Sequence, residues 1–158
     1  GHNHQHSLWG LPGTVETTCN LWSVYLYEQL IGIERNQTHR AISPLARLQT
    51  RRKYFESGAD FEKDWNVWTA LDTYLLVQEE FGWQPFQKVF AKYHHLPKNE
   101  WPKDQQEIND QWVIRLSRAC KTNLAPYWKI WKLPISDFVF AELDHLPIWE
   151  CKAIEKWK

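Results

Sequence analysis

The chain has 158 residues and carries 19 Lys and Arg against 19 Asp and Glu, so its formal net charge is zero. Balanced charge gives no electrostatic footprint for nucleic acid or an anionic membrane surface, and we expect no nucleic-acid partner. No apolar run is long enough to cross a bilayer, so we expect a protein that does not span a membrane. The length allows one domain with its own core, which we place over residues 1–158.

Three histidines stand at the start of the chain, at positions 2, 4 and 6. The H-E-x-x-H motif of zinc peptidases places two histidines four residues apart on one helical face, and its glutamate acts as general base. Gly1-His2 can supply the last two letters, with the first histidine and the glutamate upstream of residue 1. Two other interpretations stay open. His2 and His6, also four residues apart, form a zinc pair, or the histidines belong to a purification tag and hold no metal.

The segment 14–31 has apolar residues at spacings of three and four, which predicts a helix that Thr14 caps and Gly32 ends. Glu16 lies in its first turn, where the helix dipole favours a carboxylate, and it is our candidate for a further zinc ligand. The alternative is an ordinary glutamate at a helix start. Asn20, four residues on, would share the face of Glu16 and orient its carboxylate.

The eleven tryptophans are the unusual part of the composition. We expect most of them to pack in the core, with their indole N–H groups bonded to backbone carbonyls. Trp9 and Trp22 lie near the expected metal site in the sequence. They are therefore the candidates for an aromatic platform that stacks against a sugar or peptide.

The middle of the chain gives weaker signals. Residues 34–50 are polar and contain a proline, so we expect a loop with a short helical piece, followed by one or two helical turns over 51–57. Arg51, Arg52 and Lys53 form the only dense basic cluster. A solvated helix face explains this cluster better than a phosphate site does.

The remaining segments are also helical in pattern. Apolar periodicity, with Gly or Pro near the ends, predicts helices over 65–81, 85–93, 104–121, 124–131 and 135–143, and another from residue 147 onward. No segment shows the alternation of a strand, and no internal repeat is present. The predicted fold class is all-α.

The three cysteines, at positions 19, 120 and 151, are an odd number without C-x-x-C spacing. We expect buried free thiols in a reducing compartment rather than a disulfide framework.

Two blocks at the start of the chain resemble the M60 (enhancin-like) zinc metallopeptidase domain. They are Gly1-His2-Asn3-His4-Gln5 and the run TVETTCNLWSVY over residues 14–25. Within that family the resemblance is to the branch of the vertebrate TRP-channel-associated factors. It continues through 65–75, 81–86, 123–126 and 146–149, and so covers most of the chain.

The resemblance implies zinc held by both histidines of the H-E-x-x-H helix and a downstream glutamate, with His2 and Glu16 in two of these roles. It also implies that this chain is the helical C-terminal subdomain of a gluzincin-type metallopeptidase, with a sheet-containing half upstream. For M60 enzymes it implies endopeptidase activity, in several members on mucin-like glycoproteins. We expect a zinc endopeptidase with a peptide or glycoprotein substrate, and no activity from this chain alone.

For the channel-associated branch, the resemblance implies an intracellular protein that binds a TRP-type cation channel and alters its delivery to the plasma membrane. Some members of that branch lack the second histidine and the peptidase activity, whereas this sequence keeps His2. The alternative function is therefore a catalytically degenerate scaffold for such a channel. Either way we expect a cytoplasmic protein, peripheral at the plasma membrane if it serves a channel.

Overall fold

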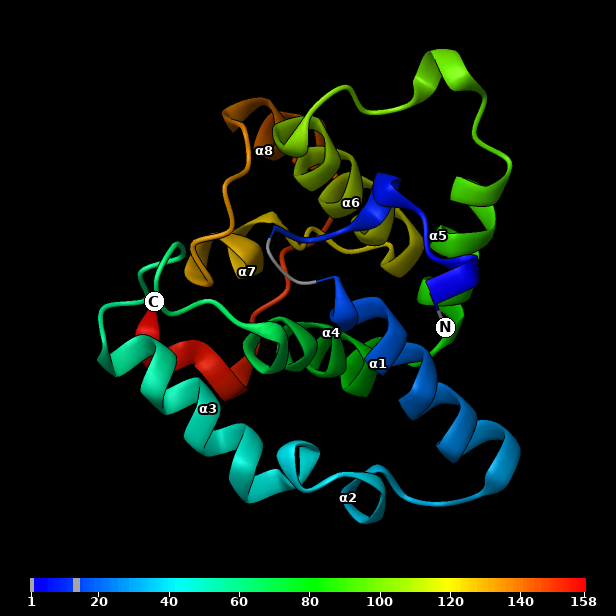
Figure 1. Ribbon diagram of the computed structural model, residues 1–158. Helices are drawn as coiled ribbons and strands as arrows, with labels where there is room; N and C mark the ends of the chain where they lie inside the picture. Colours follow the sequence, from blue (N-terminus) through cyan, green and yellow to red (C-terminus); the bar gives the residue numbers. More distant parts are fainter. Residues whose placement is uncertain (1, 13–14) are drawn as a thin grey trace. The chain divides into compact units, whose positions relative to one another are not determined.

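The computed structural model describes residues 2–12 and 15–158 (Figure 1). The described residues form helices and no strands, which confirms the all-α prediction. An isolated parallel bridge joins Asn123 and Ile148. The chain divides into two compact units, Gly1–Val77 and Gln78–Lys158. The single domain expected over residues 1–158 stays a prediction.

The first unit begins with two short 3-10 helices, His2–His4 and Ser7–Trp9, and continues with α1, Glu16–Leu26. A π-helical turn, Tyr27–Ile31, extends α1 directly. Gly32 ends it with φ of 76°, a left-handed conformation that suits glycine. The predicted helix and its C-terminal glycine are confirmed, whereas the expected N-cap, residue 14, lies outside the described residues.

The next elements are α2, Arg35–Thr38, a 3-10 helix, Arg40–Ile42, and α3, Pro44–Glu56. The Ser43 hydroxyl accepts the N–H of Ala46 and caps α3. The loop predicted through residue 50 is therefore wrong, because α3 already begins at residue 44. Backbone N–H groups in the first turn of a helix have no partner within the helix, so proline, which lacks this group, is well tolerated there. Pro44 therefore begins α3 rather than preventing it.

An ion-pair cluster joins α3 to α4, Val67–Phe81. Asp72 accepts from Arg47 Nε at 2.6 Å and from Arg51 Nε at 2.8 Å. Both arginines are 8% exposed and Asp72 is 1% exposed. The solvated helix face expected for Arg51 is therefore wrong, although its two neighbours in the basic cluster are exposed.

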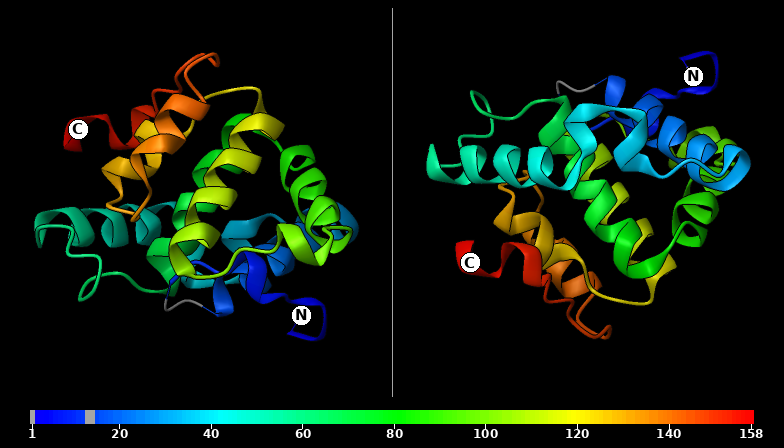
Figure 2. Two further views of the ribbon diagram at one scale, coloured as in Figure 1. Left: turned by 90° about the horizontal axis from the view of Figure 1, so that it is seen from above. Right: turned by 90° about the horizontal axis from the view of Figure 1, so that it is seen from below.

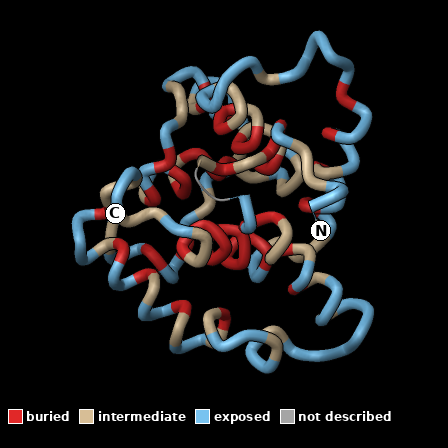
Figure 3. Tube along the Cα trace, in the orientation of Figure 1, coloured by how far each residue is buried: buried red, intermediate tan, exposed pale blue. Residues whose placement is uncertain are grey.

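The helix α4 carries much of the core. Figure 3 shows buried residues concentrated along it. Leu71, Tyr74 and Leu75 of this helix are at most 1% exposed. α1 buries Leu21 and Val24. The helix predicted over 65–81 is thus present, and its apolar side is buried as the periodicity indicates.

The second unit holds four α-helices and two 3-10 helices in the described residues. Their bounds are α5, Gln84–His94; α6, Gln105–Cys120; α7, Ala125–Ile130; α8, Asp137–Glu142; and the 3-10 helices Lys98–Glu100 and Lys152–Trp157. α5 and α6 lie side by side (Figure 2). The Asp104 carboxylate caps α6 by accepting the N–H of Glu107 at 2.8 Å. The four helices predicted here are confirmed, and the C-terminal segment takes the tighter 3-10 form.

Aromatic side chains fill the core of this unit. Trp112 is fully buried, and its ring contacts those of Phe86, Phe90 and Tyr93, with centroids 5.7–6.4 Å apart. Four tryptophans in the described residues are 0% exposed, namely Trp9, Trp112, Trp128 and Trp131. Six of the other tryptophans are half-buried and Trp101 is exposed, so full burial holds for four of the eleven rather than for most of them.

The three cysteines are free thiols, as predicted, but only Cys151 is buried, whereas Cys19 and Cys120 are half-buried. Burial raises the pKa of the Cys120 thiol to about 12. No helix in the described ranges is long and apolar enough to cross a membrane.

Candidate functional site

His2 and Glu16, which the sequence singles out as zinc ligands, lie together at the start of α1. His2 Nε2 is 3.2 Å from Glu16 Oε1, and both side chains are more than half exposed. The segment before α1 folds back over its first turn and so brings together two residues that lie far apart in the sequence. The backbone thus places one imidazole nitrogen and one carboxylate oxygen at the same exposed point.

Gln5 lies between these elements and binds both of them. Its Oε1 is 3.0 Å from His2 Nδ1, and its Nε2 donates to Thr18 Oγ1 at 2.7 Å and to the Val15 carbonyl. The sequence motif contains Gln5 but assigns it no role. Its position three residues after a candidate ligand histidine is the only local signal, and two of its partners, Val15 and Thr18, are at least ten residues away in the chain.

Cys19 is the other polar neighbour of His2. Its Sγ lies 3.5 Å from His2 Nδ1 and 3.5 Å from Gln5 Oε1. Burial, and then the nearby Glu16 carboxylate, raise the pKa of the Cys19 thiol. The protonated thiol donates a hydrogen bond to Gln5 Oε1.

The pair His2 and Glu16 fits two positions of a zinc site. Two ligands on one tetrahedral zinc, each about 2.0–2.1 Å from the metal, lie about 3.3 Å apart. The observed separation of 3.2 Å is close to that value. Within the described ranges, however, no group of three or more His, Cys, Asp or Glu side chains could hold a metal. The chain therefore brings together two possible zinc ligands, but its described residues do not contain the three or four ligands of a complete zinc site.

The alternative pairing of His2 with His6 requires one helical face, and that geometry is absent. His6 is extended, with φ of −121° and ψ of 143°. Its Nδ1 accepts the N–H of Leu8 at 3.3 Å, and its ring lies 5.6 Å from that of Trp9. The separation of four residues therefore does not bring the imidazoles of His2 and His6 to one helical face.

The two tryptophans proposed as a platform differ in exposure. Trp9 is 0% exposed, and its ring packs edge-on against Trp22 at a centroid distance of 6.5 Å. A fully buried ring offers no face to a ligand, so Trp9 supports Trp22 in this structure. Trp22 is only half-buried, and its role as a platform stays a prediction.

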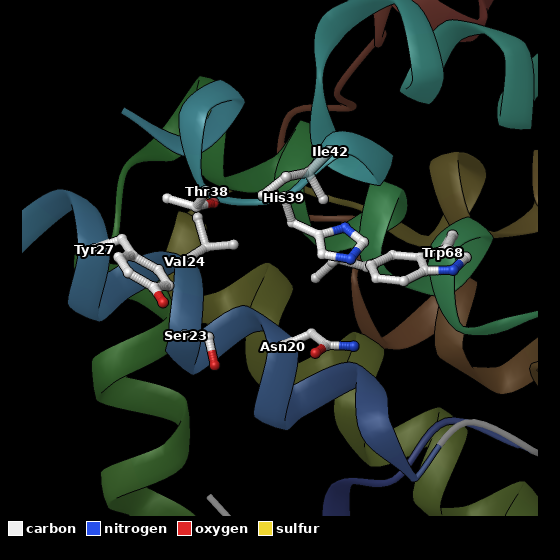
Figure 4. A pocket seen from close by; sticks show the side chains of 9 residues that line it. Asn20, Ser23, Val24, Tyr27, Thr38, His39, Ile42 and Trp68 are labelled. Carbon is white, nitrogen blue, oxygen red and sulfur yellow. The ribbon is translucent and has the colours of Figure 1, made fainter. Parts of the chain in front are cut away.

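Asn20 lies one turn after Glu16 and lines a pocket of about 210 Å³. Figure 4 shows Asn20 and Ser23 on α1 on one side of it, and His39 beside Trp68 on the other. The His39 and Trp68 rings stack at 4.8 Å, and His39 Nδ1 accepts the N–H of Ala41 at 3.1 Å. Nothing in the sequence pattern pairs these two residues.

The role expected for Asn20 was to orient the Glu16 carboxylate. No hydrogen bond between these two side chains occurs in the part of the chain that the structure describes. That role stays a prediction, and Gln5 provides the polar support that the structure does contain at the site.

The family model described as "Peptidase M60, enhancin and enhancin-like" matches residues 1–132. A solved structure with a similar fold is that of a functionally unknown conserved protein mutant from Bacillus anthracis. Its TM-score is 0.77 at 22% identity, over 96% of this chain and 30% of that one, so it supports the fold alone.

Among curated relatives, TRPM8 channel-associated factor 2 of Homo sapiens is 45% identical over 151 residues, which are 95% of this chain and 16% of that protein. TRPM8 channel-associated factor 3 of Mus musculus is 39% identical over 158 residues, which are 99% of this chain and 17% of that protein. The chain thus spans a small part of the length of these relatives. It belongs to the peptidase M60, enhancin and enhancin-like family.

Proposed function

We propose that this chain supplies part of the zinc site of an endopeptidase that cleaves peptide or glycoprotein substrates. The observation that carries the proposal is the 3.2 Å separation of His2 Nε2 and Glu16 Oε1 in a chain of the M60 family. The donors are one imidazole nitrogen and one carboxylate oxygen, a set that zinc accepts in catalytic sites.

In this proposal His2 and Glu16 hold the metal. The remaining histidine ligand and the general-base glutamate are expected upstream of residue 1. When bound, zinc lowers the pKa of a coordinated water to about 7 and polarises the scissile carbonyl. Glu16 is the first residue of α1, where the positive end of the helix dipole stabilises a negative charge.

A plain ion pair between a protonated His2 and Glu16 is the competing interpretation of the same distance. Such an exposed pair contributes at most about 1 kcal/mol to stability and is screened by salt. It would leave zinc content and peptide cleavage independent of both residues, and this difference makes the proposal testable.

The test uses the complete protein, purified with its zinc content measured, and a mucin-type or casein substrate. We expect chelator-sensitive cleavage that His2→Ala and Glu16→Gln abolish together with bound zinc. His4→Ala and Glu34→Gln are matched controls, because both native side chains are exposed, and both variants should keep zinc and activity. No chelator-sensitive cleavage in a zinc-loaded sample would refute the endopeptidase proposal.

The second candidate is a scaffold that binds a TRP-type cation channel and regulates its trafficking to the plasma membrane. It is favoured by the names of the relatives, TRPM8 channel-associated factors, at 45% and 39% identity. Under this proposal the protein acts in the cytoplasm at the inner face of that membrane. Co-precipitation of the complete protein with TRP channels tests it, and binding that survives both His2→Ala and Glu16→Gln would favour scaffold over enzyme.

A further inference from the structure

We infer that Gln5 is a positioning residue that fixes the ring orientation and the proton of His2, so that His2 Nε2 is free to bind the metal. The inference rests on the proposed zinc site. It assigns a function to a residue outside the expected ligands and general base.

The first step is the orientation of the Gln5 amide. A backbone carbonyl can only accept hydrogen bonds, so the amide group that faces the Val15 carbonyl must be the NH₂. The same nitrogen donates to Thr18 Oγ1 at 2.7 Å. The amide oxygen is therefore the atom that faces His2.

The second step is the proton of the imidazole. An amide oxygen only accepts, and it lies 3.0 Å from His2 Nδ1, so Nδ1 carries the hydrogen of this bond. In the neutral ring the lone pair then belongs to Nε2. Nε2 is the nitrogen that lies 3.2 Å from Glu16 Oε1. With a lone pair on Nε2, this nitrogen and the carboxylate oxygen would repel each other at this distance. Either a zinc ion, as proposed here, or a second proton on the ring removes that repulsion.

The third step is the rigidity of the support. Thr18 is 2% exposed, so the hydroxyl that anchors Gln5 belongs to the buried side of α1. His2 is more than half exposed and lies in a three-residue 3-10 helix, which by itself leaves its ring free to rotate. Gln5 thus connects an exposed ligand to a well-packed helix, as the hydrogen-bond partners of metal-bound histidines commonly do.

The experiment measures the zinc affinity of the complete protein by competition with a chromophoric chelator. Loss of such a partner weakens metal binding by about 10–100-fold, and we expect Gln5→Ala to fall in that range. Thr18→Val removes one of the two anchors at nearly constant volume and should weaken zinc less, in the same direction. Gln29→Ala, an exposed glutamine on the extension of α1, is the control and should leave the affinity unchanged.

A second readout reports the proton directly. In zinc-free protein, ¹⁵N chemical shifts of the His2 ring should show the hydrogen on Nδ1 in the wild type and a mixture of tautomers in Gln5→Ala. A melting temperature within a few degrees of the wild type establishes that the variant is folded.

The outcomes separate the two proposals. If His2→Ala retains full zinc affinity, the zinc site itself is refuted. If His2→Ala loses zinc while Gln5→Ala matches the wild type in affinity and tautomer, the positioning role of Gln5 is refuted and the zinc site stands.

Discussion

Asp72→Asn should be among the most destabilising substitutions in the first unit. The Asp72 carboxylate is the shared partner of Arg47 and Arg51, at 2.6 Å and 2.8 Å, and all three side chains are at most 9% exposed. The variant keeps the volume and removes the negative charge, which leaves two buried guanidinium groups without their counter-charge.

Removing one partner of a buried ion pair costs about 3–5 kcal/mol. For a chain of this length, 1 kcal/mol lowers the melting temperature by about 2–4 °C, so we expect a loss of about 6–20 °C. Thermal unfolding of the chain followed by tryptophan fluorescence measures it. Arg52→Ala on the same helix is the control, because its pair with Glu56 is more than half exposed and contributes less than about 1 kcal/mol.

A comparison with a second variant, Arg47→Met, tests the same reasoning about buried charge. Arg47→Met leaves Asp72 paired one-to-one with Arg51, so no charge is left without a partner. It should therefore cost less than Asp72→Asn, although it also removes a guanidinium. If Asp72→Asn melts within 2 °C (about 1 kcal/mol or less) of Arg52→Ala, or if Arg47→Met is the more damaging variant, the reasoning from buried charge is wrong.

Three further predictions concern other parts of the chain. Asp110→Asn should lower the free energy of unfolding of the second unit by about 1–3 kcal/mol. The reason is that the buried Asp110 carboxylate accepts both the N–H and the hydroxyl of Ser136 at the start of α8. An unchanged midpoint of urea unfolding would contradict this. Because burial raises the pKa of the Cys120 thiol to about 12, this thiol should resist iodoacetamide at pH 8 in the folded chain and react after denaturation. Mass spectrometry can follow the alkylation. Equal alkylation rates in the folded and denatured chain would contradict the prediction. The 158-residue chain alone should cleave no casein and should bind zinc no more tightly than about 1 μM, because two protein ligands are too few for a stable site. Submicromolar affinity in a titration would overturn that prediction.

The helices were predictable because their signals are local. Gly32 ends the α1 extension in a left-handed conformation, and Asp104 caps α6, each within one turn of the residues that it affects. The apolar periodicity of 65–81 was sufficient to predict α4 and its buried side. The first turns of α3 are harder to predict, because Pro44 is compatible with either a loop or a helix start.

The sequence by itself determined the helical class, because apolar periodicity is a short-range signal, and its resemblance to the M60 family pointed to His2 and Glu16. The tertiary structure decided that these two side chains meet, and that Gln5 rather than Asn20 supports them. It also decided that Arg51 is buried against Asp72, 21 residues away, although the basic cluster looks like a solvated face. The physical reason is the same in each case. Helix formation depends on neighbours within a turn, whereas the burial of a charge and the support of a ligand depend on which distant segments pack together.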